Sequence, residues 1–392
     1  MDIELSCSGK KIRVANRQQI LFISTLNGGA WGGSEVFWFT MALALAKQGH
    51  AVTVAWLDWP ERAAKNQQLL DAGCTVLLLP NHRFATNPLQ KLLRKKKAAD
   101  TLKKNILAKK YRQVVISQSG FEDVTHHPFN ALQGLLPHYI LLYHNYNLQQ
   151  RLSGSRRASL QKWTAGATLN LGASQQIFNA MPTMAGFEMT NTAILYNPIG
   201  FEPATAPTAW PDSSHGNWVF TVLGQLDCKR KAQDVLINVL AQPKWQQRNW
   251  ELWLYGEGSD RGLLENLIQT NQLQNKIFLK GHTSNPKEVL AQSHLLLQLT
   301  HIDAMPIAVV EAMSMGRPCL VTQVGDMPQW VTDGFNGWVA DAATMADIDA
   351  ILEKAWQLQD KWPQMGERAF ATFAQKYPTP YINYYSDIIL NT

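Results

Sequence analysis

The sequence predicts an α/β protein made of two domains, each a doubly wound parallel sheet with helices on both faces. A chain of 392 residues exceeds what one hydrophobic core usually supports. Short apolar runs rich in leucine or β-branched residues alternate with helical patterns through both halves, as they do in parallel sheets covered on both faces. The composition is 46% hydrophobic and 17% charged, so the chain can bury substantial cores.

Ten strands are expected, five in each half of the chain. Those of the first half are ILFIST (20–25), AVTVAWL (51–57), CTVLLL (74–79), QVVIS (113–117) and YILLYH (139–144). Those of the second half are WVFTVLG (218–224), WELWLYG (250–256), KIFLKG (276–281), HLLLQLT (294–300) and RPCLVT (317–322). Because apolar strands that alternate with helices form parallel sheets, each series predicts one doubly wound domain.

The sequence divides into four parts. Residues 1–200 are expected to form the first domain and residues 217–372 the second. Residues 201–216 are rich in Pro, Ala and Ser without apolar periodicity, which is typical of a linker. Residues 373–392 contain a proline break and then aromatic residues at helical spacing, so we expect a C-terminal helix that packs back on the first domain. Ligands of open parallel sheets bind beyond the carboxyl ends of the strands, which predicts an active cleft between the domains.

The sequence shows no sign of a membrane span, an export signal or a metal cluster. Its longest apolar runs are far shorter than the ~20 residues that cross a bilayer. Residues 1–19 lack the continuous apolar core of a secretory signal, so a cytoplasmic location is expected. Cys7, Cys74, Cys228 and Cys319 have neither metal-ligand nor redox spacing, and we interpret them as reduced.

The net charge of +6 comes from one segment. Residues 91–112 hold ten Lys or Arg and one acid, a local charge of +9 that leaves the rest of the chain at −3. Five aliphatic residues recur here at near-helical spacing, which predicts a surface helix with a basic outer face. They are Leu92, Leu93, Leu102, Ile106 and Leu107. Two interpretations are open, a solvated face or a surface that binds an anionic membrane or an acidic partner. Nucleic acid fits less well, because no recognition motif or aromatic stacking platform accompanies the charge.

A glycine-rich loop follows the first expected strand. In LNGGAWGGSEVFWF (26–39), Gly32 and Gly33 come directly before a helix whose first N–H groups can receive an anion. Glu35 falls three residues after Gly32, at the position of an N-terminal capping acid. The spacing fits neither G-x-G-x-x-G nor a P-loop, which ends in Lys followed by Ser or Thr, so a nicotinamide dehydrogenase is disfavoured.

Two carboxylates stand in an otherwise apolar run of the second half, HIDAMPIAVVEAM (301–313). Pro306 is expected to open a helix, because a proline in the first turn has no N–H to leave unpaired and a φ that suits a helix start. The first N–H groups of this helix suit a phosphate. Glu311 lies about one turn inside and can bind two vicinal hydroxyls, while Asp303 in the preceding loop can reach another part of the same ligand.

Cations precede another helix of the second half. VLGQLDCKRKAQDVLI (222–237) places Gln225 and the cations Lys229, Arg230 and Lys231 between a strand and a helix. A lysine beside a helix start adds a charged hydrogen bond to a bound phosphate. The second half of the chain thus offers a helix start and a lysine for a diphosphate, one acid that can bind a diol and a second acid that can reach another sugar. Together these features describe a nucleotide-sugar site.

The sequence resembles glycosyltransferase family 4, whose members are retaining enzymes of the GT-B fold. The resemblance covers nearly the whole chain and implies a first Rossmann-like domain on the acceptor side and a second that binds the nucleotide sugar. It rests on an ordered set of segments: WGGSEVFWFTMALALAKQGHAVTV, ILLYHNYN, LGASQQI, ILYNPIG, VLGQLDCKRKAQDVLI, WLYGEGSD, IFLKGHTSN and DAMPIAVVEAMSMGRPCLVTQVGDMPQWVTDGFNGWV.

The resemblance also implies roles for single residues. The family's signature of two glutamates separated by seven residues falls on Asp303 and Glu311, of which Glu311 would bind the ribose hydroxyls. Asp303, one methylene shorter than the usual glutamate, would meet hydroxyls of the donor sugar, and His144 stands where the family has a histidine facing that sugar. Lys231 matches the family's diphosphate lysine, whereas Gln225 replaces its arginine. The implied catalytic residues are therefore His144 and Asp303. The implied donor-binding residues are Gly32, Gly33, Gln225, Lys231, Met305, Pro306, Ile307 and Glu311.

The implied activity is transfer of a hexose-type sugar, with retention and by front-face attack, from a nucleotide diphosphate sugar to a hydroxyl acceptor in glycan or glycolipid biosynthesis. A UDP-sugar is the favoured donor and GDP-mannose the next, and the acceptor is a glycan, a lipid-linked glycan or a small molecule. No cofactor and no metal are expected. A GT-B-like nucleotide-sugar epimerase and a non-catalytic sugar-nucleotide-binding relative stay open as alternatives. The expected location is the cytoplasm or the inner face of the membrane, where residues 91–112 would meet anionic lipid.

Overall fold

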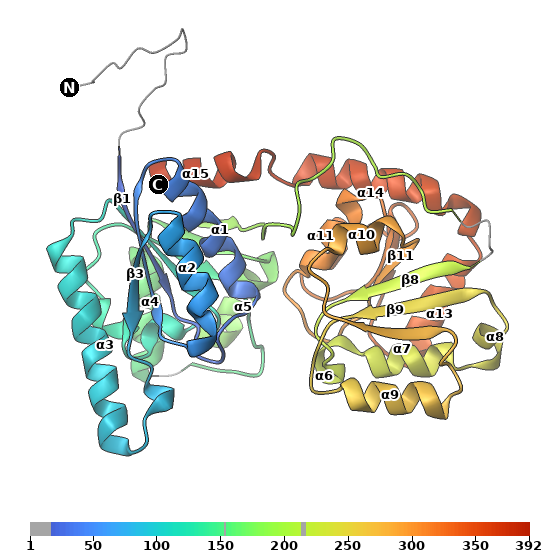
Figure 1. The fold of residues 1–392 in the computed structure, drawn as a ribbon, viewed down its shortest axis with the longest axis horizontal. Helices are drawn as coiled ribbons and strands as arrows, with labels where there is room; N and C mark the ends of the chain where they lie inside the picture. Colours follow the sequence, from blue (N-terminus) through green and yellow to red (C-terminus); the bar gives the residue numbers. More distant parts are fainter. Residues whose placement is uncertain (1–16, 153, 213–216) are drawn as a thin grey trace, which may run out of the picture. The chain divides into compact units, whose positions relative to one another are not determined.

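The computed structural model describes residues 17–152, 154–212 and 217–392. Most of the segment considered for an export signal, with Cys7, and residues 213–216 of the expected linker lie outside the described residues. The chain divides into two compact units (Figure 1). The first comprises Met1–Gly172, Ile177–Leu195 and Pro380–Thr392, and the second comprises Ala173–Gln176 and Tyr196–Thr379.

The first unit is built on a parallel sheet of seven strands in the order β3-β2-β1-β4-β5-β6-β7. Its strands are β1 (Gln19–Ser24), β2 (Ala51–Leu57), β3 (Thr75–Leu79), β4 (Gln113–Gln118), β5 (Tyr139–Tyr143), β6 (Leu169–Gly172) and β7 (Thr192–Ile194). The strand order reverses between β1 and β4, where Ser24 lies in register with Ser117. Ligands of doubly wound sheets bind beyond the strand ends at such a reversal, so these two serines mark the functional edge of the unit.

Helices cover the two faces of this sheet (Figure 1). They are α1 (Gly33–Lys47), α2 (Ala63–Asp71), α3 (Pro88–Ala108), α4 (Gly154–Gly166), α5 (Gln175–Ala185) and α15 (Tyr381–Asn391), with 3-10 turns at Pro60–Arg62, His82–Phe84, Asp123–Thr125 and Phe129–Leu132. The C-terminal helix α15 contributes Tyr385 and Ile389 to the core of the unit. The ring of Tyr385 packs edge-on against Phe37 of α1, with 4.9 Å between ring centroids.

The second unit has six parallel strands in the order β10-β9-β8-β11-β12-β13, with a reversal between β8 and β11. The strands are β8 (Trp218–Leu223), β9 (Trp250–Tyr255), β10 (Ile277–Gly281), β11 (Leu295–Gln298), β12 (Cys319–Thr322) and β13 (Gly337–Ala340). The helices are α6 (Cys228–Lys231), α7 (Gln233–Leu240), α8 (Pro243–Gln246), α9 (Arg261–Thr270), α10 (Pro286–Ala291), α11 (Ile307–Ser314), α12 (Met327–Trp330), α13 (Met345–Trp356) and α14 (Trp362–Lys376), with a 3-10 turn at Gln359–Lys361. A buried core that includes Trp245, Trp250, Trp338 and Trp362 holds these layers together.

The predicted fold class, two doubly wound parallel-sheet domains, is confirmed. All ten expected strands occur, and β6, β7 and β13 are additional. Part of the segment expected to be a linker packs on the second unit, because the buried guanidinium of Arg317 donates hydrogen bonds to the carbonyls of Thr208 (3.2 Å) and Ala209 (2.7 Å). Within the described ranges, no helix has both the length and the apolar character that crossing a bilayer requires.

Helix α3 differs from its prediction in the direction that its leucines face. Leu92, Leu93 and Leu107 are exposed, whereas the buried positions are Ala98, Ala99 and Leu102. The expectation of a helix whose outer face is basic is therefore incomplete, since that face carries leucines as well as lysines. The small side chains of Ala98 and Ala99 let the helix lie close to the rest of the unit, and Leu92, Leu93 and Leu107 are left on the outside.

Candidate active site

Two glycine turns meet beyond the strand ends of the second unit. One follows β8 at Gly224, and the other follows β9 at Gly256, which has a φ of +147°. A Cβ atom on Gly256 would lie 1.9 Å from the carbonyl oxygen of Gly224, so no other residue fits there without moving the backbone. The N–H of Leu226 donates to the carbonyl of Glu257 at 3.0 Å and ties the two turns together.

These turns form one side of a cavity of about 400 Å³. Its lining comes from the ends of β8, β9 and β10, the start of α10 and the interior of α11: Leu223, Gly224, Gln225, Tyr255, Gly256, Glu257, His282, Thr283, Pro286 and Glu311. Two sequence-predicted donor-binding residues, Gln225 and Glu311, are thus brought together. The volume is that of a small-molecule site, and its position beside the strand-order reversal is where ligands of such sheets bind.

Glu311 presents a carboxylate to this cavity from the interior of α11. The side chain is only 7% exposed, and Oε1 accepts a hydrogen bond from the N–H of Gly200 at 2.8 Å. Burial raises the pKa of Glu311 above its usual value, and the Gly200 N–H offsets part of that rise. Because Oε2 has no hydrogen-bond partner among the described residues, Glu311 keeps acceptor capacity for a ligand.

A second carboxylate, Asp303, forms an ion pair with the ammonium group of Lys231. Both side chains are mostly buried, 15% and 13% exposed respectively. The loop after β11 is attached to the end of α6, because the Thr300 hydroxyl and the His301 N–H both donate to the carbonyl of Arg230, the latter at 2.8 Å. The backbone therefore fixes where Lys231 and Asp303 meet.

The start of α11 is held by the loop after β12. Pro306 is the N-cap of the helix, which begins at Ile307, one residue later than predicted. Gly325 has a φ of +56°, and a Cβ atom there would lie 1.9 Å from the carbonyl oxygen of Ala304. Met305, between Ala304 and Pro306 in the chain, is partly buried. The N–H groups of the first turn have no intrahelical acceptors, so this rigid helix start is suited to an anion.

Lys231 also adjoins the turn that lines the cavity. A Cβ atom built on Gly224 would contact the Cε atom of Lys231 at 3.9 Å. The second unit thus brings Gln225, Lys231, Asp303 and Glu311 to the carboxyl ends of its central strands. Within the described ranges no cluster of three His, Cys, Asp or Glu side chains has the arrangement of a metal site.

The remaining predicted residues, Gly32, Gly33 and His144, lie in the first unit. Gly32 is the N-cap of α1 and Gly33 its first residue. A Cβ atom on Gly33 would meet no atom within 4 Å. The packing of the chain itself gives no reason for glycine at that position, which is consistent with a helix start that leaves room for a bound group.

Glu35 does not cap α1, which corrects the sequence-based assignment. Its carboxylate is fully buried and accepts hydrogen bonds from the Ser24 hydroxyl (3.1 Å), the Ser34 hydroxyl (3.3 Å) and the Trp38 indole N–H (3.0 Å). Desolvation raises the pKa of Glu35 to about 7, although the nearby positive charge of Arg62 and these hydrogen bonds lower it. The acid fastens the helix start to the end of β1.

His144 follows β5, and its Nε2 lies 3.1 Å from the Ser117 hydroxyl. That hydroxyl has one proton, which it donates to the carbonyl of Ser34 at 3.0 Å. Ser117 can therefore only accept from His144, which places the imidazole proton on Nε2 and leaves a lone pair on Nδ1. Nδ1 is buried without a partner among the described residues, and burial lowers the pKa of His144 to about 4. The ring is a neutral hydrogen-bond acceptor.

Three contributors to these sites were not predicted. Ser117 could have been noticed as a polar residue at the end of an apolar strand beside the strand-order reversal. Arg62 is fully buried and donates to the carbonyls of Ala30 (2.6 Å) and Leu57 (2.9 Å), which holds the glycine loop. No sequence signal identifies Arg62 or Gly200, because Arg62 reaches Ala30 across 32 positions and Gly200 reaches Glu311 across 111.

The fold is that of the GT-B glycosyltransferases, with two doubly wound α/β units. Residues 211–372 match the family model for glycosyl transferases group 1, which supports a place for this part of the chain in that group. Assignment to glycosyltransferase family 4 in particular stays a prediction.

Relatives of known name are glycosyltransferases or related synthases. The N-acetyl-alpha-D-glucosaminyl L-malate synthase of Bacillus anthracis is 27% identical over 147 residues, which cover 36% of this chain and 38% of the relative. The poly(glycerol-phosphate) alpha-glucosyltransferase of Bacillus subtilis is 30% identical over 132 residues, which cover 33% of this chain and 19% of the relative. The chain therefore spans well under half the length of these two relatives.

Similarity to solved structures extends over nearly the whole chain. Anabaena HepE, solved in complex with UDP and glucose, has a TM-score of 0.72 and 19% identity, and the alignment covers 96% of this chain and 100% of that one. At this identity the similarity establishes the fold and leaves the substrate to be argued from the site.

Proposed function

We propose that this protein is a glycosyltransferase that uses a nucleotide diphosphate sugar. The observation that carries the proposal is the arrangement in the second unit, where a cavity of about 400 Å³ contains the buried carboxylate of Glu311 and borders the Lys231–Asp303 ion pair. The group 1 match over residues 211–372 and the names of the relatives support the same class.

Each part of the proposed donor has a chemical counterpart in this unit. Glu311 would accept hydrogen bonds from the ribose hydroxyls, since Gly200 engages Oε1 and Oε2 has no partner among the described residues. Lys231 and the N–H groups at the start of α11 would bind the diphosphate. Asp303, which Lys231 holds in place, would accept from hydroxyls of the sugar. We favour a UDP-sugar as the donor, with GDP-mannose next, and the UDP complex of the structurally similar HepE supports that order.

The proposed reaction is transfer with retention. The bond from the anomeric carbon to the nucleoside diphosphate breaks as the acceptor hydroxyl attacks the same face through an oxocarbenium-like state. Lys231 and the α11 start would stabilise the charge that develops on the departing phosphate, so the mechanism requires no metal. His144 would accept a hydrogen bond from the sugar through Nδ1, since Nε2 is engaged by Ser117. The proposed acceptor is a hydroxyl of a glycan, a lipid-linked glycan or a small molecule.

The test is a panel of UDP-, GDP- and ADP-sugars incubated with and without candidate acceptors, followed by analysis of free nucleotide and sugar products. Nucleotide release that depends on an acceptor supports transfer, and the anomeric configuration of the product decides whether the enzyme is retaining. An isomerised sugar would indicate an epimerase instead. Tight donor binding without turnover across the panel would indicate a non-catalytic sugar-nucleotide-binding protein.

Two further points belong to the proposal. No cofactor is expected to take part, and the nucleotide sugar is a substrate. The predicted contact of residues 91–112 with an anionic membrane surface, and thus a place at the inner face of a membrane, involves α3 of the first unit and is independent of the donor site.

A further inference from the structure

Helix α3 exposes a continuous strip of leucines and lysines. Four leucines project to solvent with large exposed fractions, Leu89 (67%), Leu92 (65%), Leu93 (56%) and Leu107 (72%). They alternate with charged residues at spacings of three and four, which places all of them on one side of the helix. We define the α3 outer face as Leu89, Leu92, Leu93, Lys96, Lys97, Asp100, Lys104 and Leu107. It spans about 27 Å along the helix axis.

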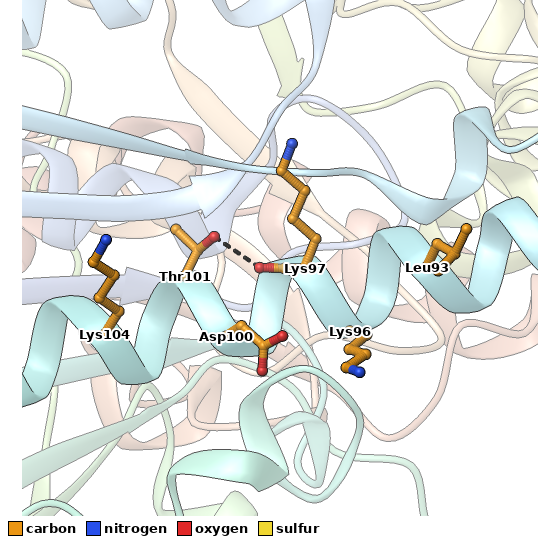
Figure 2. Close-up of a pocket in the computed structure, with 6 residues that line it drawn as sticks. All are labelled: Leu93, Lys96, Lys97, Asp100, Thr101 and Lys104. Atoms are coloured by element: carbon orange, nitrogen blue, oxygen red, sulfur yellow. Dashed lines mark hydrogen bonds between the residues drawn. The ribbon is translucent and has the colours of Figure 1, made fainter.

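The lysines of this face are not used inside the protein. Figure 2 shows Lys96, Lys97 and Lys104 extending away from the helix, with a hydrogen bond only between the Thr101 hydroxyl and the Lys97 carbonyl. No ion pair within the described ranges involves any residue of α3. The helix carries seven cations (Lys91, Arg94, Lys95, Lys96, Lys97, Lys103 and Lys104) and one acid, Asp100, a net charge of +6.

The opposite side of α3 is anchored to the first unit. Ala98, Ala99 and Leu102 are buried there, and the Arg94 guanidinium donates to the carbonyl of Asn81 at 3.1 Å. The Asn87 side chain caps the helix by accepting from the N–H of Gln90 at 2.8 Å. These contacts anchor the helix and involve no residue of the α3 outer face. The described residues therefore reveal no structural role for the leucines of that face.

Charge and apolar area together decide which partner this face fits. Four leucines on one side of a helix form an exposed apolar strip, which marks an interaction or membrane surface more often than a solvated face does. A second copy of the chain would bring two helices of charge +6 together. Nucleic acid would use the lysines but gain little from leucines that neither stack on bases nor contact phosphates. A bilayer with anionic headgroups uses both, since lysines pair with the headgroups while leucines enter the headgroup and acyl boundary.

We propose that the α3 outer face binds an anionic lipid bilayer. In this arrangement Leu89, Leu92 and Leu93 insert at the start of the helix, and Lys96, Lys97 and Lys104 contact the headgroups. The face would keep the protein at a surface where a lipid-linked acceptor is present. The inference does not depend on the donor site, which lies in the other unit.

The test is cosedimentation of the full chain with phosphatidylcholine vesicles that contain or lack phosphatidylglycerol. Replacing Lys96, Lys97 and Lys104 together by glutamine should weaken binding to the anionic vesicles roughly 100-fold, since each lysine near such a surface contributes about fivefold. Replacing Leu89, Leu92 and Leu93 by glutamine, which keeps helix propensity, should remove the part of the binding that persists at high salt.

The matched control is a triple glutamine variant at Lys47, Lys162 and Lys361, exposed lysines outside α3 whose loss changes net charge by the same amount. This control should bind like the parent protein. Three results would each overturn the proposal. The two lysine variants could lose vesicle binding equally, the leucine variant could bind vesicles like the parent protein, or the parent protein could bind heparin but no vesicles. UDP affinity should stay unchanged in all three variants, so a protein that binds vesicles but no nucleotide would refute only the proposed transferase function.

Discussion

Removal of the charge on Glu311 tests the donor site most directly. In the Glu311→Gln variant the side chain keeps its size, and its amide oxygen can still accept from the N–H of Gly200. What is lost is the negative charge that the ribose hydroxyls would contact. Hydrogen bonds to charged groups contribute about 1.5–3 kcal/mol, so nucleoside diphosphate affinity should fall about 10- to 100-fold.

The Glu311→Ala variant separates binding from stability. It removes the acceptor of the Gly200 N–H as well, a hydrogen bond of the kind that contributes about 0.5–1.5 kcal/mol to stability. The alanine variant should therefore unfold at lower denaturant concentration than the glutamine variant, although both lose the ribose contact. Chemical denaturation measured without ligand gives this difference.

Isothermal titration calorimetry with UDP and with uridine supplies the assay. Both ligands contain the ribose, so Glu311→Gln should weaken both by a similar factor. The matched control is Glu257→Gln, which removes a carboxylate from the lining of the same cavity. If Glu311→Gln binds both ligands as tightly as the parent protein, the ribose assignment is refuted, and a loss in the Glu257 variant alone would move that role to Glu257.

Three further predictions concern the surroundings of these sites. Lys231→Met should weaken UDP by about tenfold or more while leaving uridine affinity unchanged in calorimetry, because only UDP carries the phosphates; equal losses for both ligands would contradict the diphosphate role. Ser117→Ala should lower kcat by a few-fold with little change in KM and should shift the imidazole nitrogen NMR signals of His144, whereas Ser117→Thr, which keeps the hydroxyl, should restore both. Unchanged signals in the alanine variant would remove Ser117 as the positioning residue. Burial raises the pKa of Glu35 from 4.5 to about 7, so between these values the folded chain retains a proton that the unfolded chain has lost. Stability should thus fall by up to about 3 kcal/mol as pH rises through this window, and Glu35→Gln should flatten the slope in denaturant titrations at several pH values.

The sheets were predictable because their central strands are continuous apolar runs bounded by polar turns. The unpredicted strands β6, β7 and β13 have only three or four residues each, and β6 contains the polar Asn170. Such segments form strands because neighbouring strands supply their hydrogen bonds. The orientation of α3 was missed for a related reason, since the spacing of its leucines does not show which of them the tertiary structure buries.

The candidate site was predictable where one segment carries the chemistry, as with Asp303 and Glu311 around the start of α11. Partners from distant segments were not. The N–H of Gly200 reaches Glu311 across 111 positions, and Ser117 reaches His144 across 27. Ser117 meets His144 because the parallel strands β4 and β5 end at the same edge of their sheet, whereas Gly200 belongs to no strand. Single-sequence patterns give no register for either contact.

Charge balance in the second unit restricts how a diphosphate can bind there. Glu257 and Glu311 line the cavity, Asp303 is paired, and the lining residue Gln225 brings no charge. Attraction for an anion must then come from the α11 start and from Lys231, whose ammonium keeps two N–H donors after one bond to Asp303. The phosphates should therefore lie on the Lys231 side and the ribose on the Glu311 side, which is why UDP and uridine respond differently to the two substitutions.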